Sequence, residues 1–206
     1  MEAKLNPHID PHRDDEGSKL GMWLFLFTEL LLFGGLFLVY SIYRMQNSEV
    51  FAHCGKGLNL TIGTINTIIL LTSSLTVAMS ITAIKKKNKK LSMVLLFITL
   101  LSALAFLVNK YFEWAHKIDL GIYPGSEYLK TAPHGEGLFY LLYYFMTGLH
   151  AFHVIVGAVL LSVILVFVAR ERITHDNNQL LENGGLYWHL VDLIWIYLFP
   201  LFYLIH

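Results

Sequence analysis

Five long apolar segments limit what this chain can fold into. They cover residues 20–43, 62–84, 91–114, 137–169 and 186–206. A helix that crosses the hydrocarbon layer of a membrane needs about 20 mostly apolar residues, and each segment meets that length. The composition agrees, because 55% of the residues are hydrophobic and only 15% are charged. The sequence therefore predicts an all-α integral membrane protein, a bundle of five transmembrane helices.

Polar residues divide the rest of the chain. Residues 1–19 are predicted to form a polar tail, and residues 20–206 the five-helix membrane domain. With the amino terminus inside, the inside segments hold ten Lys and Arg residues and the outside segments hold five. This distribution predicts an amino terminus inside and a carboxyl terminus outside. The basic loop at 85–90 is tethered between two spans, which favours contact with anionic lipid over contact with nucleic acid.

Redox centres would have to be built from histidine, because Cys54 is the single cysteine. Three histidines lie inside spans, with His150 and His153 three residues apart and His189 in the last span. A haem held by two histidines needs both at matching depth, but His189 lies near the inner end of its span and the other two near the middle of theirs. Glu29 is the one obvious third ligand for a metal ion. The sequence therefore predicts no haem and no metal in this chain.

Glu29 is an energetic anomaly, because it stands alone in the apolar stretch "FLFTELLLFGGLF". Ionisable groups inside a membrane are costly and therefore face the interior of a bundle, where they find one another. Residues three apart share one face of a helix. The sequence predicts a buried polar network whose members are Glu29, His150, His153, His189 and Asp192.

Glu113 lies at the outer end of the third span, next to Lys110 and Trp114. It can be an interfacial charge within an aromatic belt or a functional acid, and the residues leave both interpretations open. Tryptophan is enriched where a span meets the membrane surface. The predicted candidates for interface and lipid contact are Glu113, Trp114, Trp188 and Trp195.

Four stretches together carry a family likeness. They are "LGMWLFLFTELLLFGGLF", "INTIILLTSSLTVAMSI", "GLHAFHVIVGAVLL" and "LYWHLVDLIWIYLFPLFYLI". In order and spacing the chain resembles subunit III of haem-copper oxidases, the cytochrome c oxidase subunit III family, in its five-span prokaryotic form. Under this resemblance Glu29 corresponds to the family's buried carboxylate, and His150 and His153 correspond to its fourth-span histidine pair. The other matching residues are Trp188, His189, Asp192 and Trp195 in the last span and Glu113 with Trp114 in the third.

The resemblance implies an accessory subunit without a redox centre of its own. Haem and copper are then expected in subunits I and II, and this chain is expected to pack on subunit I. It also implies bound phospholipid, support of proton uptake, protection of the oxygen-reducing site during turnover, and a place in the prokaryotic plasma membrane. Longer relatives have seven spans, of which the first two form one wall of a lipid-filled cleft. That wall has no counterpart in these five spans.

Several alternatives stay open. Some five-span relatives accompany quinol oxidases or nitric oxide reductases, and nothing in these residues chooses the electron donor. A stand-alone proton or solute transporter would use Glu29, His150, His153 and Asp192 as a relay, although no inverted repeat supports that plan. A membrane cytochrome b would use the same histidines as haem ligands.

Overall fold

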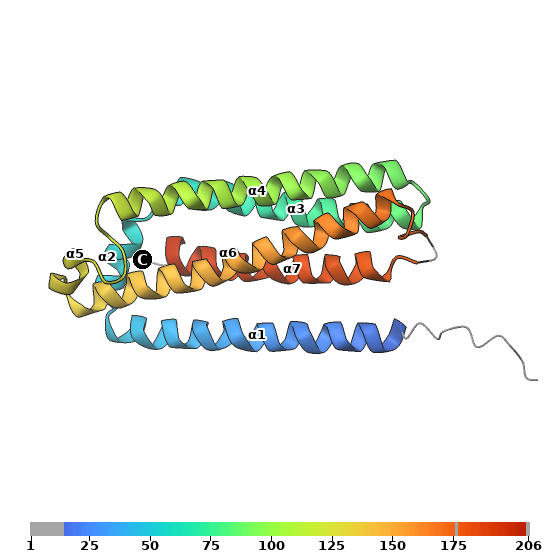
Figure 1. The fold of residues 1–206 in the computed structure, drawn as a ribbon. Coiled ribbons are helices and arrows are strands. Elements are labelled where there is room, and N and C mark those ends of the chain that lie inside the picture. The colour runs from blue at the N-terminus through green and yellow to red at the C-terminus, as the bar shows by residue number, and fades with distance from the viewer. Residues whose placement is uncertain (1–14, 176, 205–206) are drawn as a thin grey trace, which may run out of the picture.

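A computed structural model describes residues 15–175 and 177–204 of the protein, and its fold is all-α (Figure 1). Five helices are long and apolar enough to cross a membrane, which confirms the predicted fold class. The sidedness of the termini stays a prediction. The elements are α1 (Asp15–Gln46), α2 (Ser48–Lys56), α3 (Leu60–Lys85), α4 (Lys89–Asp119), α5 (Glu127–Thr131), α6 (His134–Ala169), α7 (Gln179–Phe199) and the π-helix η1 (Pro200–Leu204).

The long helices extend beyond the predicted spans. The fourth apolar segment was predicted from residue 137, but α6 begins at His134, and α7 begins at Gln179 where residue 186 was predicted. The difference arises because an apolar count stops at the edge of the hydrocarbon, whereas the backbone continues to satisfy its own hydrogen bonds through polar residues. The short helices α2 and α5 were not predicted, since neither is long enough to cross the membrane. Most of the predicted tail, residues 1–14, lies outside the described residues.

Asparagine and serine side chains mark where several helices begin. The side-chain oxygen Oδ1 of Asn59 accepts from the backbone N–H groups of Thr61 and Ile62 at the start of α3. Asn88 does the same for Leu91 of α4. Such caps satisfy amides that have no partner within the helix. The Asn88 cap lies in the short connection between α3 and α4, and the Asn59 cap lies at the opposite end of α3.

The helices run roughly side by side, with α1 at one edge (Figure 1). α3 and α4 form an antiparallel pair with hydrogen bonds between Thr76 and Thr99 at 2.7 Å and between Asn109 and Asn66 at 2.9 Å. α7 is the most enclosed span, since 56% of its apolar window is buried compared with 11% for α1. The core therefore lies among α3, α4, α6 and α7, and α1 is attached to it from the side.

Candidate functional site

Glu29 of α1 contacts His153 of α6 across the gap between the edge helix and the core. The Glu29 Oε2 atom lies 3.0 Å from His153 Nε2, and the two side chains are 16% and 9% exposed. His153 Nδ1 lies 2.8 Å from the Leu149 carbonyl oxygen. Because a carbonyl can only accept, Nδ1 must carry a proton. The Glu29–His153 contact then holds a second proton, which can reside on the carboxyl or on the imidazole.

His150 does not join this contact, although it is only three residues away. Its side chain is fully buried, with its ring 5.5 Å from that of Phe106 and 5.3 Å from that of Trp195, centroid to centroid. Neither ring nitrogen has a hydrogen-bond partner. The prediction that both histidines share one network is therefore wrong for His150. Three residues advance a helix by less than a full turn, so His153 faces α1 while His150 faces the core.

The last-span signature fastens α7 to α3. His189 Nδ1 lies 2.7 Å from Ser74 Oγ, and the Trp188 indole N–H donates to Ser73 Oγ at 3.0 Å. About two helical turns further on, the Trp195 indole donates to Thr67 Oγ1 at 3.0 Å. Three polar groups of α7 thus contact the serine- and threonine-rich face of α3.

Trp188 and Trp195 differ from their prediction as interface anchors. Their side chains are 0% and 1% exposed, so both lie inside the bundle. Trp114 is half-buried, packs against Tyr144 at 5.4 Å between ring centroids, and directs its indole nitrogen inward without a partner. A tryptophan near the end of a span can face lipid or the core, and sequence position does not distinguish the two cases.

Asp192 is the second acid of the predicted network, and the structure isolates it. Its side chain is 2% exposed, and neither carboxyl oxygen has a hydrogen-bond partner. The Ser74 hydroxyl interacts with it without forming a well-placed hydrogen bond. The five predicted members therefore form two separate groups, the Glu29–His153 contact and the Ser74–His189–Asp192 neighbourhood, with His150 apart from both.

Glu113 belongs to a buried group that we name the lysine–glutamate cluster, formed by Lys110, Glu113, Tyr143 and Tyr203. Lys110 Nζ lies 3.1 Å from Glu113 Oε2 and donates to the Tyr143 and Tyr203 hydroxyls at 3.0 and 2.9 Å. Both tyrosines donate to Glu113 Oε1, at 2.9 and 2.5 Å. Each charged group therefore has several partners, contributed by α4, α6 and η1.

The prediction of Glu113 as an interfacial charge is wrong, because its side chain is only 5% exposed. The spacing of Lys110 and Glu113 is a signal for an ion pair, but the two tyrosines lie far away along the chain. Tyr203 reaches the cluster because η1 continues α7 as a π-helix after Pro200. No local pattern in the sequence indicates this π-helix or the contact of Tyr203 with Glu113.

An apolar groove lies beside the Glu29–His153 contact. It has a volume of about 280 Å³ between α1 and α7 and is lined by Leu30, Phe33, Gly34, Phe37, Leu193, Ile194 and Tyr197. Within residues 15–175 and 177–204, no group of three or more His, Cys, Asp or Glu side chains is arranged to hold a metal ion. The predicted absence of haem and metal stays a prediction.

Comparisons with known proteins extend over nearly the whole chain. The family model described as "Cytochrome c oxidase subunit III" matches residues 8–206. A "Probable quinol oxidase subunit 3" of Staphylococcus saprophyticus is 33% identical over 199 residues, covering 94% of this chain and 92% of that protein. Its counterpart in Staphylococcus aureus is 30% identical over 196 residues, covering 93% and 90%. A "Heme-copper oxidase subunit I+III" of Aeropyrum pernix is 32% identical over 197 residues, covering 89% of this chain but only 22% of the longer protein.

Proposed function

The chain belongs to the cytochrome c oxidase subunit III family, and from this premise we propose that it is the accessory, non-redox subunit of a respiratory haem-copper oxidase. The subunit would support proton uptake and endurance during oxygen reduction without carrying the reaction itself. The observation that carries the proposal is the Glu29–His153 contact, in a chain whose residues 8–206 match the family model.

The expected direct partner is subunit I. The Aeropyrum pernix relative is named as a fusion of subunits I and III, and a fused pair supports an arrangement in which the separate chains pack together. Haem and copper are expected in subunits I and II, which would perform the electron chemistry. A place in the prokaryotic plasma membrane is proposed on the same grounds, together with five spans that suit a multi-pass membrane protein.

The proposed contribution of this chain to proton uptake rests on the chemistry of Glu29 and His153. With Nδ1 bound to a backbone carbonyl, the pair shares one proton between a carboxyl and an imidazole. Moving that proton requires no rearrangement of either helix. A pair of this kind can accept and return protons at membrane depth, where exchange with water is slow.

Bound phospholipid is the second proposed element. The groove between α1 and α7 is lined by apolar side chains, which suits an acyl chain and offers nothing to a headgroup. A lipid held in this groove would contact side chains of α1 and α7.

The electron donor remains a choice between two candidates. We propose the cytochrome c type from the likeness to that family. The quinol type is a second candidate, because the staphylococcal relatives are named "Probable quinol oxidase subunit 3". Turnover of the purified complex with reduced cytochrome c and with a quinol, measured as oxygen consumption, separates them. Activity with only one donor assigns it.

Substitution of Glu29 tests the accessory role. We expect Glu29→Ala to leave the haem content of the purified complex unchanged and to shorten the time over which it sustains turnover, because the shared proton is lost. Oxygen consumption is followed to inactivation, with haem measured from the visible spectrum. Glu127→Ala is a matched control, since that carboxyl is 89% exposed in an ion pair with Lys130 within the short helix α5.

Three results would contradict the proposal. Loss of haem from Glu29→Ala with every subunit still present would make this chain part of a haem site. A Soret band from the isolated chain would favour a membrane cytochrome b. Proton or solute flux through a purified monomer would favour a stand-alone transporter.

A further inference from the structure

Asp192 of α7 is a buried acid that the function proposed above does not use. Its side chain is 2% exposed, and neither carboxyl oxygen has a hydrogen-bond partner among the described residues. Glu113 is buried to a similar extent but accepts from several donors, as a structural acid should. In apolar surroundings an ionised carboxylate without donors costs far more than a neutral carboxyl. The geometry therefore favours a neutral Asp192 that carries a proton.

Ser74 of α3 connects this acid to an imidazole. Its hydroxyl interacts with Asp192, and its Oγ atom lies 2.7 Å from His189 Nδ1. The nearby hydroxyls of Thr72 and Thr76 donate instead to carbonyl oxygens of their own helix. The Ser74 hydroxyl is thus directed across the contact between α3 and α7, where it meets both ionisable side chains.

The three side chains have a consistent order of donors and acceptors. A neutral imidazole has one donor and one acceptor nitrogen, and a hydroxyl can donate and accept at once. When Ser74 donates to Nδ1 of His189, its oxygen is free to accept from the Asp192 carboxyl, and Nε2 carries the ring proton. If Asp192 gives its proton to Ser74, Ser74 passes its own proton to Nδ1, and Nε2 releases one proton to water. The reverse steps restore the neutral acid.

His189 links this group to the surface of the bundle. Its side chain is half-buried, and Leu193 and Ile196, on the same face of α7, are 43% and 44% exposed. Glu182 lies two turns before His189, roughly 10 Å along the helix. It forms an ion pair with Lys85 at 2.8 Å, and the two side chains are 28% and 53% exposed. The contact between α3 and α7 therefore begins at an exposed ion pair and leads inward to His189.

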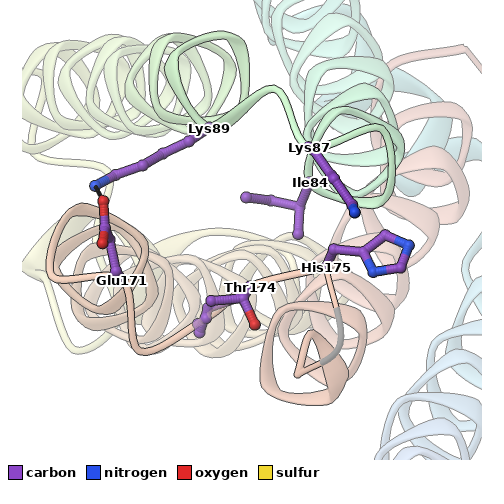
Figure 2. A pocket seen from close by; sticks show the side chains of 7 residues that line it. Ile84, Lys87, Lys89, Glu171, Thr174 and His175 are labelled. Atoms are coloured by element: carbon purple, nitrogen blue, oxygen red, sulfur yellow. Dashed lines mark hydrogen bonds and ion pairs between the residues drawn. The ribbon is translucent and has the colours of Figure 1, made fainter.

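The end of the bundle at which α7 begins carries charged side chains (Figure 1). The connection between α3 and α4 meets the connection between α6 and α7 there, and Lys87, Lys89 and Glu171 line a pocket of about 300 Å³ (Figure 2). The Lys89 and Glu171 side chains are 36% and 76% exposed. Charged loops of this kind lie in water at the membrane surface. His189 is close enough to this end to lie near the headgroup region, which water enters.

We propose that the Ser74–His189–Asp192 neighbourhood is a second proton-exchange site, in which Asp192 holds a proton as a neutral acid and His189 exchanges it with water. The site is separate from the Glu29–His153 contact, because it lies between α3 and α7 whereas that contact joins α1 and α6. It does not rest on the proposed oxidase function, since every step uses side chains of this chain.

Infrared spectroscopy of the full chain in phosphatidylcholine nanodiscs tests the site. A neutral carboxyl group gives a C=O stretching band that is separate from the bands of carboxylates, and replacement of its proton by deuterium shifts that band. We expect Asp192→Asn to remove one such band, which identifies the band of Asp192. After transfer of the unmodified chain into D2O, the Asp192 band should shift, because water exchanges with the acid through His189.

His189→Phe and Ser74→Ala test the route that the proton takes. Each should slow the deuterium shift of the Asp192 band roughly tenfold or more, because each removes a group that passes the proton. His189→Phe should leave the position of that band unchanged, whereas a merely structural role of His189 would move it. Thr72→Val is the matched control, since it removes a hydroxyl of α3 that is bonded to its own helix. Its exchange rate should stay within about twofold of the unmodified chain.

Three results would overturn the proposal. If Asp192→Asn removes no neutral-carboxyl band, the acid is ionised. If the Asp192 band does not shift in D2O, water does not reach the acid. If the unmodified chain, His189→Phe and Ser74→Ala exchange at equal rates, protons reach Asp192 by another route.

Discussion

α1 and α7 are attached to the same bundle in different ways. In α7, 56% of the apolar window is buried, and its tryptophans interlock with α3 and α6. In α1 only 11% of the window is buried, and its contacts with α6 include the Glu29–His153 contact and the packing of the Phe33 ring on the His153 ring. A helix that is fixed by close packing tolerates little change in side-chain volume. A helix with less buried surface tolerates such changes more easily. The packing around α7 is therefore more extensive than the packing around α1.

Glu113 in the core and Glu29 on α1 differ in the number of their hydrogen-bond partners. Glu113 accepts from Lys110, Tyr143 and Tyr203, so its charge is fully compensated inside the core. Glu29 has one partner and a partly exposed side chain. Removing a buried carboxyl that has several fixed partners leaves more groups unsatisfied, so Glu113 is expected to matter more for stability than Glu29.

The largest effect is expected from Glu113→Ala. It would leave the Lys110 ammonium buried without its counter-charge, which costs about 3–5 kcal/mol. The melting temperature of the purified complex should fall steeply, or the chain should fail to assemble. The double variant Lys110→Met with Glu113→Leu removes both charges and should recover much of the loss. If Glu113→Ala alone leaves the melting temperature unchanged, the cluster does not hold the core together.

An effect of intermediate size is expected from substituting glycines in the core and on α1. A Cβ added at Gly157 would lie 2.8 Å from the Trp188 ring, whereas one added at Gly34 of α1 would meet nothing within 4 Å. Gly157→Ala should therefore destabilise the protein by about 1–3 kcal/mol through overpacking. Gly34→Ala should be neutral or slightly stabilising, because alanine favours the helix. Equal shifts in melting temperature for the two variants would contradict the conclusion that α1 is packed less tightly than the core.

A smaller effect is expected from Glu29→Gln. The amide keeps the shape of the side chain and can still bond to His153, so the loss of stability should be about 1 kcal/mol or less. α1 should nevertheless become easier to cleave near its ends, which limited proteolysis followed by mass spectrometry detects. A stability loss as large as that of Glu113→Ala would show that α1 is an integral part of the core.

The smallest effect concerns Cys54 of α2, outside the spans. Burial raises the pKa of its thiol to about 12, with a further contribution from nearby Glu136. The thiol should therefore stay protonated and react slowly with a maleimide, with little acceleration between about pH 7 and pH 9. Labelling should become fast only after denaturation. Rapid labelling of the folded complex at neutral pH would show that α2 opens readily.

Local patterns predicted some of these features and not others. The five spans follow from apolar runs, and the Glu29–His153 contact follows from the rule that polar groups in a membrane seek one another. His150 and Trp195 show the limit, since both were given polar or interfacial roles and both pack in the core. Tyr203 contacts Glu113 from the π-helix Pro200–Leu204, and no sequence pattern predicts that helix.

The sequence by itself determined the membrane class, the number of spans and the family, because hydropathy and motif spacing are properties of consecutive residues. Only the tertiary structure decided which polar groups meet. The rotation of each helix about its own axis and the neighbour that it faces arise from packing between distant segments. This rotation brings His153 to Glu29, turns His150 toward Trp195, and encloses Glu113 with two tyrosines.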